Sequence, residues 1–122
     1  MSKGPFRAIL IDATSREISV VVVTDFRSIQ KAIGCDCFTT AFRLPKNGIC
    51  YVDDEGLING TQTFFKFRGD LGERIFAGNG LIMGGTRGGN SADSTEDVEE
   101  IRKRVTFLTP LEALLEARRL GL

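Results

Sequence analysis

Hydrophobic and polar residues alternate or cluster along most of this chain in the manner of short β-strands. Residues 6–12 and 18–24 are rich in β-branched side chains, and the polar stretch between them has a length that suits a hairpin. The continuous apolar run from Val20 to Val23 predicts a strand that is covered on both faces and lies near the centre of its sheet.

The hydrophobic period changes after this hairpin and predicts a helix. Apolar residues recur at helical spacing up to Ile33, with Thr24 or Asp25 placed to cap the start. Gly34 stands where a left-handed C-cap belongs. We therefore expect one helix directly after the first two strands.

Alternation then returns and predicts five further strands. In the first of them, Phe38, Thr40, Phe42 and Leu44 should share one face, with Thr39, Ala41 and Arg43 on the other. The turn after it, residues 45–48, has Pro45 to set φ and Gly48 to supply a positive φ. The remaining strands are expected at residues 49–52, 61–68, 74–83 and 104–108, and Gly78-Asn79-Gly80 interrupts the third of these as a bulge or bend.

The C-terminal third predicts a loop and two helices. Residues 84–94 are rich in Gly, Asn, Ser and Thr, which predicts a mobile loop. A helix follows up to Arg104, with acidic residues in its first turn and basic residues in its last. Thr109, Pro110 and Glu112 form a strong start for a last helix, residues 110–120. The stripe of Leu111, Leu114 and Leu115 on this helix should either pack on the sheet or meet a partner chain.

Together these elements predict an α+β fold. Its mainly antiparallel sheet has about six to seven short strands, with one helix after the first hairpin and two C-terminal helices. A chain of 122 residues is expected to form one domain, residues 1–122, whose core spans about 6–108. A domain of this size can bury about two thirds of its unfolded surface without disulfides or metals.

The composition of the chain argues against several kinds of partner and active site and excludes those that need histidine. Sixteen basic residues balance sixteen acidic ones, so no net positive charge attracts nucleic acid or membrane. Histidine is absent, which removes the commonest general base and every histidine-containing metal site. An odd number of cysteines and no long apolar run predict a reducing, cytoplasmic setting and no membrane span.

The three cysteines do not predict a cofactor. Cys35, Cys37 and Cys50 provide three zinc ligands at unusual spacing, where a structural zinc needs about four. Free cysteine is among the most buried residue types, so these side chains are better interpreted as small core residues. We expect no cofactor.

Three adjacent carboxylates form the clearest candidate for a metal or acid/base site. Asp53, Asp54 and Glu55 could bind Mg²⁺ or Mn²⁺ through oxygen, joined by Asp12 or Asp36, as in a metal-dependent hydrolase or nuclease. Adjacent carboxylates on a strand point to opposite faces, however, so at most two can converge. Asp53 followed three residues later by Gly56 is also typical of a hairpin turn in which the glycine takes a positive φ, and we favour that interpretation.

Two further patterns could bind an anion. The glycine-rich run 84–90, with Arg87 as the cation, loosely resembles a phosphate-binding loop, but it lacks the Gly-Lys-Ser/Thr ending. A nucleic-acid interface would need a common face, with Phe64 for stacking and the basic residues Arg7, Arg43, Lys66, Arg68 and Arg74. Neutral net charge makes nucleic acid the less favoured partner.

Several short motifs together carry a family resemblance. They are Ile33-Gly34-Cys35-Asp36, Arg43-Leu44-Pro45, Tyr51 to Leu57, and Gly78-Asn79-Gly80-Leu81-Ile82-Met83-Gly84. Over residues 6 to 108 the chain resembles domain-of-unknown-function family 3846. This resemblance implies a small cytosolic protein of a phage, a plasmid or a host genome that carries one, and the family has no established activity, cofactor or catalytic residue.

The candidate ligand-binding residues come from the sequence itself and not from the resemblance. They are Arg43, Tyr51, Asp53, Asp54, Glu55 and Arg87.

No nucleophile with an adjacent base is evident, and most of the chain is used to build the fold. We therefore expect a binding or interaction module of a mobile element, with a host protein, a small ligand or further copies of itself as partners. The metal-dependent enzyme and the nucleic-acid-binding protein remain as alternatives.

Overall fold

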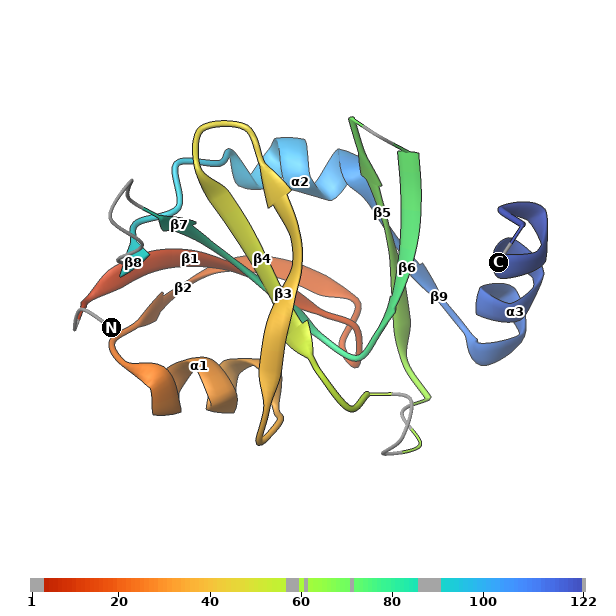
Figure 1. The fold of residues 1–122 in the computed structure, drawn as a ribbon, viewed down its shortest axis with the longest axis horizontal. Coiled ribbons are helices and arrows are strands. Elements are labelled where there is room, and N and C mark those ends of the chain that lie inside the picture. Colours follow the sequence, from red (N-terminus) through yellow and green to blue (C-terminus); the bar gives the residue numbers. More distant parts are fainter. Residues whose placement is uncertain (1–3, 57–59, 61, 71, 86–90, 122) are drawn as a thin grey trace.

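The fold comes from a computed structural model that describes residues 4–56, 60, 62–70, 72–85 and 91–121. Within these residues, strands and helices follow one another in the order shown in Figure 1. The strands are β1 (Phe6–Asp12), β2 (Glu17–Val23), β3 (Phe38–Leu44), β4 (Gly48–Asp53), β5 (Phe64–Gly69), β6 (Gly72–Ala77), β7 (Gly80–Gly85), β8 (Ser91–Ala92) and β9 (Val105–Leu108). The helices are α1 (Phe26–Ile33), α2 (Val98–Arg104) and α3 (Pro110–Arg119). The predicted α+β class is confirmed, with more strands than expected.

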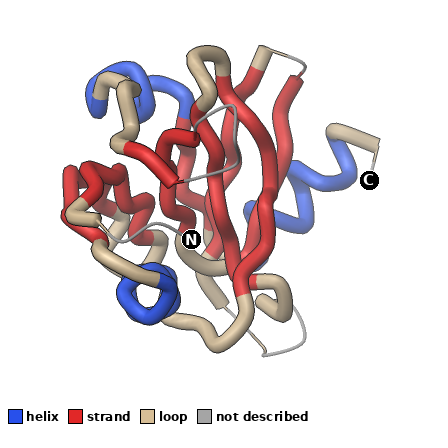
Figure 2. The backbone as a smooth tube through the Cα atoms, turned by 60° about the vertical axis from the view of Figure 1, so that its left-hand side comes forward, coloured by secondary structure: helices blue, strands red, loops and turns tan. Residues whose placement is uncertain are grey.

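The strands form two antiparallel sheets rather than one. The first has the order β2-β1-β7-β4-β3, and the short β8 also pairs with β7. The second has the order β6-β5-β9. Figure 1 shows the second sheet, with β5 and β6 in green, beside the first, and Figure 2 shows the strands of both from the side.

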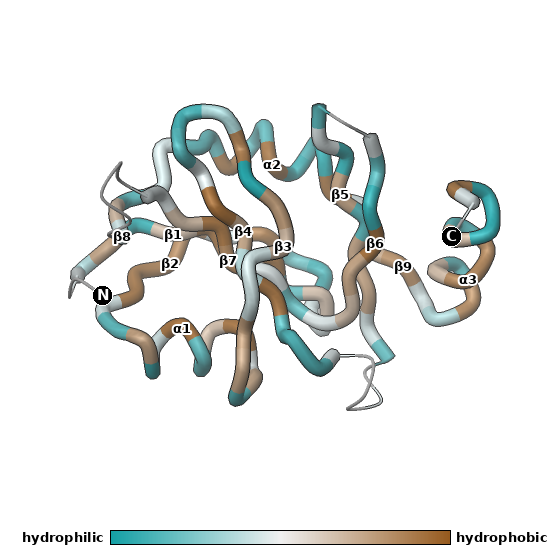
Figure 3. The backbone as a smooth tube through the Cα atoms, viewed as in Figure 1, coloured by the Kyte–Doolittle hydropathy of each residue, from teal (hydrophilic) through white to brown (hydrophobic). Residues whose placement is uncertain are grey.

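Two hydrophobic clusters hold these layers together. The larger lies between the sheets and joins Ile9, Cys50 and Ile82 of the first sheet to Phe65 of the second and Ile101 of α2. The smaller lies on the other face of the first sheet, where α1 contributes Ile29 and Ile33. Figure 3 shows the hydrophobic residues concentrated on the central strands, with hydrophilic residues in many of the turns. The first sheet is therefore covered by α1 on one face and by α2 and the second sheet on the other.

Local sequence explains where the helices begin and end. The Asp25 side chain accepts the Ser28 N–H and closes a capping box at the start of α1, while Gly34 ends α1 at a φ of 82°. Thr109 and Glu112 form the equivalent box at the start of α3. These predicted caps are confirmed. No helix in the described parts of the chain has the length and apolar character needed to cross a membrane.

The predicted central position of the valine run is wrong. β2 is an edge strand, and Val20 and Val22 are 47% and 67% exposed. Val23 on the opposite face is buried against α1. A continuous apolar run therefore marks a strand here without placing it at the centre, because β-branched side chains also suit an edge.

Residues 74–83 are two strands in different sheets, not one interrupted strand. β6 pairs with β5, and β7 pairs with β1 and β4. The chain crosses between the sheets at Gly78, whose φ is 84°. Gly80 then lies opposite Phe65 of the second sheet, and a Cβ on it would lie 2.9 Å from the Phe65 Cζ atom. The glycines are needed for this crossing and for the close approach of the two sheets.

The described part of the predicted mobile loop, residues 84–94, includes regular structure. Gly84 and Gly85 belong to β7, Ser91 and Ala92 form β8, and residues 86–90 lie outside the described residues. Asp93 accepts the Arg7 N–H at 2.7 Å through its side chain. Ser94 and Arg7 are further joined by a backbone hydrogen bond of 2.7 Å. This segment is therefore attached to β1 despite its loop-like composition.

Candidate functional site

A β-bulge in β3 decides which side chains meet at the candidate site. The register between β3 and β4 shifts between Thr40 and Phe42, so Ala41 is the additional residue. The shift places Phe42 toward the cluster between the sheets, whereas Phe38 faces the α1 side. The predicted alternation along residues 38–44 is therefore wrong beyond Thr40, and Arg43 and Thr40 lie on the same face.

The turn after β3 also differs from expectation. Lys46 and Asn47 have positive φ values of 61° and 63°, whereas Gly48 is the first residue of β4. The Asn47 carbonyl accepts the Gly85 N–H at 2.9 Å, which ties this turn to the end of β7. A Cβ on Gly48 would lie 2.9 Å from the Leu44 Cβ atom. Gly48 is thus required by crowding and not by its φ angle.

The bulge and the turn enclose a cavity of about 280 Å³ at the ends of β3, β4, β7 and β8. Arg43 of β3 and Tyr51 of β4, both candidate residues from the sequence, line this cavity together. Its other lining residues are Thr40, Leu44, Asn47, Gly48, Ile49, Gly84, Gly85 and Ser91. We call this cavity the Arg43 pocket.

The charge of the Arg43 pocket is positive. Among the described residues that line it, Arg43 is the only charged one, and no carboxylate is present. The hydrogen bonds and ion pairs of the described chain include none made by the Arg43 side chain, so its guanidinium is available to a ligand. Thr40, Tyr51 and Ser91 add hydroxyl groups and Asn47 adds an amide. Such a site can bind an anion through one charge-assisted hydrogen bond and several neutral ones.

Tyr51 is held in a form that can donate a hydrogen bond. Burial raises the pKa of its phenol, and the nearby Arg43 charge lowers it by a smaller amount. The ring packs edge-on against Phe38, with 5.2 Å between the ring centroids. The hydroxyl therefore stays protonated at neutral pH and can donate to an anion.

The acidic run is a turn, as predicted, but it is not a hairpin. The Asp53 side chain accepts the Glu55 N–H at 2.9 Å, and the Asp54 N–H donates to the Cys37 carbonyl at 3.0 Å. The next strand, β5, belongs to the other sheet, and Gly56 is buried without a positive φ. A Cβ on Gly56 would lie 3.1 Å from the Ala77 Cβ atom, so close packing explains this glycine.

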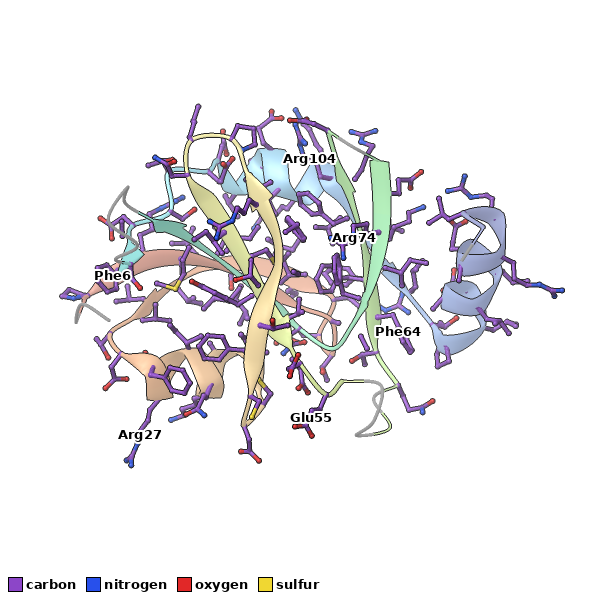
Figure 4. All side chains as sticks on the ribbon, viewed as in Figure 1. Phe6, Arg27, Glu55, Phe64, Arg74 and Arg104 are labelled. Atoms are coloured by element: carbon purple, nitrogen blue, oxygen red, sulfur yellow. The ribbon has the colours of Figure 1, made fainter. Side chains whose placement is uncertain are left out.

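The carboxylates do not gather into a metal site in the described residues, where no group of three or more potential metal-ligating side chains occurs. Glu55 points away from the sheets in Figure 4. Asp12 accepts the N–H groups of Thr14 and Ser15 and caps its own turn. Asp53, Asp54 and Glu55 instead line a separate cavity of about 340 Å³ beside β6.

The cysteines occupy different environments. Cys50 is fully buried between the sheets, Cys35 is partly buried beside α1, and Cys37 is exposed. Burial raises the pKa of the Cys35 thiol to about 11, with the charge of Asp53 adding to the effect. The expectation of small core residues is confirmed for Cys50 and wrong for Cys37.

The basic residues named for nucleic-acid binding do not form one face. The Arg7 guanidinium donates to the carbonyls of Ser94 and Glu96, at 2.8 and 3.0 Å. Lys66 forms ion pairs with Glu73 at 2.8 Å and Glu116 at 3.0 Å on the other side of the second sheet. These two cations are therefore used within the fold.

A larger cavity, of about 650 Å³, lies between β3 and the second sheet and is lined by both Arg43 and Arg74. Its walls include Phe42 and Phe67, whose rings stack with 4.3 Å between centroids. Arg74 donates to the Ala41 carbonyl at 2.8 Å and lies over the Phe76 ring. Figure 4 labels Arg74 on the second sheet. Arg74 thus holds the bulge in place, which leaves Arg43 as the cation free for a ligand.

Sequence reasoning missed Thr40, Asn47 and Ser91 as lining residues of the Arg43 pocket. Local pattern does not reveal the bulge that turns Arg43 toward them, because a bulge depends on pairing with β4. Arg87, the remaining candidate, lies outside the described residues.

Comparison with known proteins places the chain in a family. Residues 6–106 match the family described as domain of unknown function (DUF3846), and the chain belongs to this family. No curated protein and no solved structure matches it. The resemblance expected from the motifs is thereby confirmed.

Proposed function

We propose that this protein is a binding module whose Arg43 pocket takes a small ligand bearing a phosphate or carboxylate group. The observation that carries the proposal is the Arg43 guanidinium, which has no protein partner in the described chain and lines a cavity without a carboxylate. An unpaired cation beside hydroxyl and amide groups favours an anion, because none of the described residues that line the Arg43 pocket carries a competing negative charge.

The size of the pocket limits the ligand. Its volume of about 280 Å³ falls near the lower end of ligand cavities, which span roughly 300–1,000 Å³. A free anion, or the anionic end of a larger molecule, suits this volume. The phage or plasmid setting implied by the family resemblance forms part of the proposal, with the ligand arising in the host cytoplasm.

The proposal can be tested by thermal-shift and calorimetric titration with inorganic phosphate, citrate and mononucleotides. We expect at least one of these probes to stabilise the protein, and Arg43→Gln to remove the effect. Tyr51→Phe should weaken binding several-fold, about the loss of one hydrogen bond. Arg27→Gln is the matched control, since Arg27 is exposed on α1 and points away from the sheets in Figure 4.

Two results would contradict the proposal. The first is no stabilisation by any of the three probes. The second is stabilisation that Arg43→Gln and Arg27→Gln reduce equally, because this would reflect general charge and not the pocket. The alternative of a metal-dependent enzyme predicts heat on titration with Mg²⁺ or Mn²⁺ that Asp53→Asn abolishes.

A further inference from the structure

We infer that two copies of this chain associate through α3, with the two helices antiparallel. The inference concerns a different part of the molecule from the Arg43 pocket. α3 begins at Pro110, beyond the family match, which ends at residue 106. The family domain thus ends before this helix, and the helix needs its own explanation.

α3 is attached to the second sheet by its inner side. Ala113 is buried there, and Glu116 accepts hydrogen bonds from Lys66 of β5 and from Arg119. Arg119 also pairs with Glu73 of β6 at 3.1 Å. These contacts fix the rotation of the helix, so the side that faces outward is set by the fold.

The exposed side of α3 is apolar, and Leu114 at its edge also lines a cavity of about 340 Å³ between α3 and the second sheet. Leu111, Leu114 and Leu115 are 65%, 59% and 55% exposed, and with Arg118 they follow the i, i+3, i+4, i+7 spacing of one helical face. They are half of the large hydrophobic residues that are exposed in the described chain. Figures 1 and 2 both show α3 at the periphery of the molecule, where a partner can approach it. Grouped exposed leucines of this kind typically mark an interaction surface.

The charges on α3 indicate that the partner bound to this leucine surface is a second copy of the chain. Glu112 lies in the first turn and Arg118 in the last. When two such helices pair antiparallel, the leucines meet across the two-fold axis and each Glu112 approaches the basic end of the other helix. A parallel pair would place Glu112 beside Glu112 and Arg118 beside Arg118, which is unfavourable. Antiparallel pairing also aligns the helix dipoles favourably.

The dimer should be weak. A helix of ten residues is about 15 Å long, and two of them bury less than the roughly 800 Å² per partner of a standard interface. Standard-size interfaces have dissociation constants from about 1 µM downward, so we expect this smaller one to be weaker, on the order of 10 µM or more. Sedimentation velocity of the full chain from about 5 to about 500 µM covers this range.

The first test uses two matched substitutions. Leu115→Glu should shift the midpoint of dimerisation to a concentration at least about 100-fold higher, because it buries a charge in the interface. Val22→Glu changes an apolar residue on β2 that is at least as exposed as Leu115, and it should leave the midpoint unchanged. Far-UV circular dichroism of both variants shows whether the fold is retained. A chain that is monomeric at about 500 µM, or one whose dimer survives Leu115→Glu, overturns the inference.

The second test determines orientation by cross-linking. In a Cys35→Ser, Cys37→Ser background, Leu115→Cys lies near the two-fold axis and should form a disulfide-linked dimer on mild oxidation. Leu111→Cys should not cross-link to itself in an antiparallel pair. Efficient cross-linking of Leu111→Cys and none of Leu115→Cys would contradict the antiparallel arrangement.

Discussion

The contact between the two sheets at Gly80 allows a quantitative test of the fold. An added Cβ at Gly80 would lie 2.9 Å from Phe65 Cζ, 3.3 Å from Phe65 Cε1 and 3.4 Å from Cys50 Sγ. Unstrained carbon contacts lie at about 3.5–4.0 Å, so Gly80→Ala overlaps the ring by roughly 0.5 Å or more. Because Phe65 is 0% exposed, the ring has little room to move away.

The expected cost follows from two opposing terms. Overpacking a well-packed core typically costs about 1–3 kcal/mol. Alanine restricts the unfolded chain more than glycine does, and this stabilises the folded state by about 0.4–1 kcal/mol where alanine fits the native backbone. Gly80 does not have a positive φ, so its backbone conformation is compatible with alanine. We therefore expect Gly80→Ala to lower the free energy of unfolding by about 1–2 kcal/mol. The native state should survive, because a domain of this size is stable by about 5–15 kcal/mol.

Urea denaturation followed by far-UV circular dichroism measures this change. Gly69→Ala on β5 is the matched control, because its Cβ would meet only ordinary contacts, the nearest at 3.7 Å from the Gly72 carbonyl oxygen. We expect Gly69→Ala to be neutral within about 0.5 kcal/mol.

A second substitution tests whether the destabilisation by Gly80→Ala comes from its contact with the Phe65 ring. Phe65→Leu alone should destabilise the protein, but in the Gly80→Ala background the added methyl occupies space that the ring has vacated. The double variant should therefore be more stable than the sum of the single changes predicts, by at least about 0.5 kcal/mol. Additive effects, or a Gly80→Ala variant as stable as Gly69→Ala, would refute the packing described between the sheets.

Two further predictions concern titratable groups. Hydrogen bonds from Arg119 and Lys66 hold the pKa of Glu116 in the folded protein below its ordinary value of 4.5. The ionised Glu116 therefore stabilises the folded state. This contribution is fully present above the unfolded pKa and is lost as the pH falls through the lowered folded pKa. The stability difference between the unmodified protein and Glu116→Gln, measured by urea denaturation, should therefore shrink as the pH falls below 4.5, and an unchanged difference at about pH 2 would contradict the ion-pair network. In alkylation followed by mass spectrometry, Cys37 should react first and Cys35 more slowly, with a rate that rises toward pH 11 because burial raises its pKa to about 11. Equal rates at pH 7.5 would show that Cys35 is as accessible as Cys37.

Local sequence predicted the helices well because their determinants are local. Capping by Asp25 and Thr109 and the left-handed Gly34 involve hydrogen bonds or backbone angles within a few residues. The candidate site was predicted less completely. Arg43 and Tyr51 were identified, but the residues that enclose them come from strands that pair only in the folded chain. Their convergence was therefore not visible in the sequence.

The same division applies to the whole protein. Sequence alone determined the α+β class, most strand positions, the family and the turn at Asp53, since each depends on short-range periodicity or on turn residues. Only the tertiary structure decided that β6 and β7 belong to different sheets, that Val20 lies at an edge, and that the bulge at Ala41 turns Arg43 toward Tyr51. The physical reason is that strand pairing and register are set by contacts between residues far apart in the chain, and a shift of one residue exchanges the two faces of a strand.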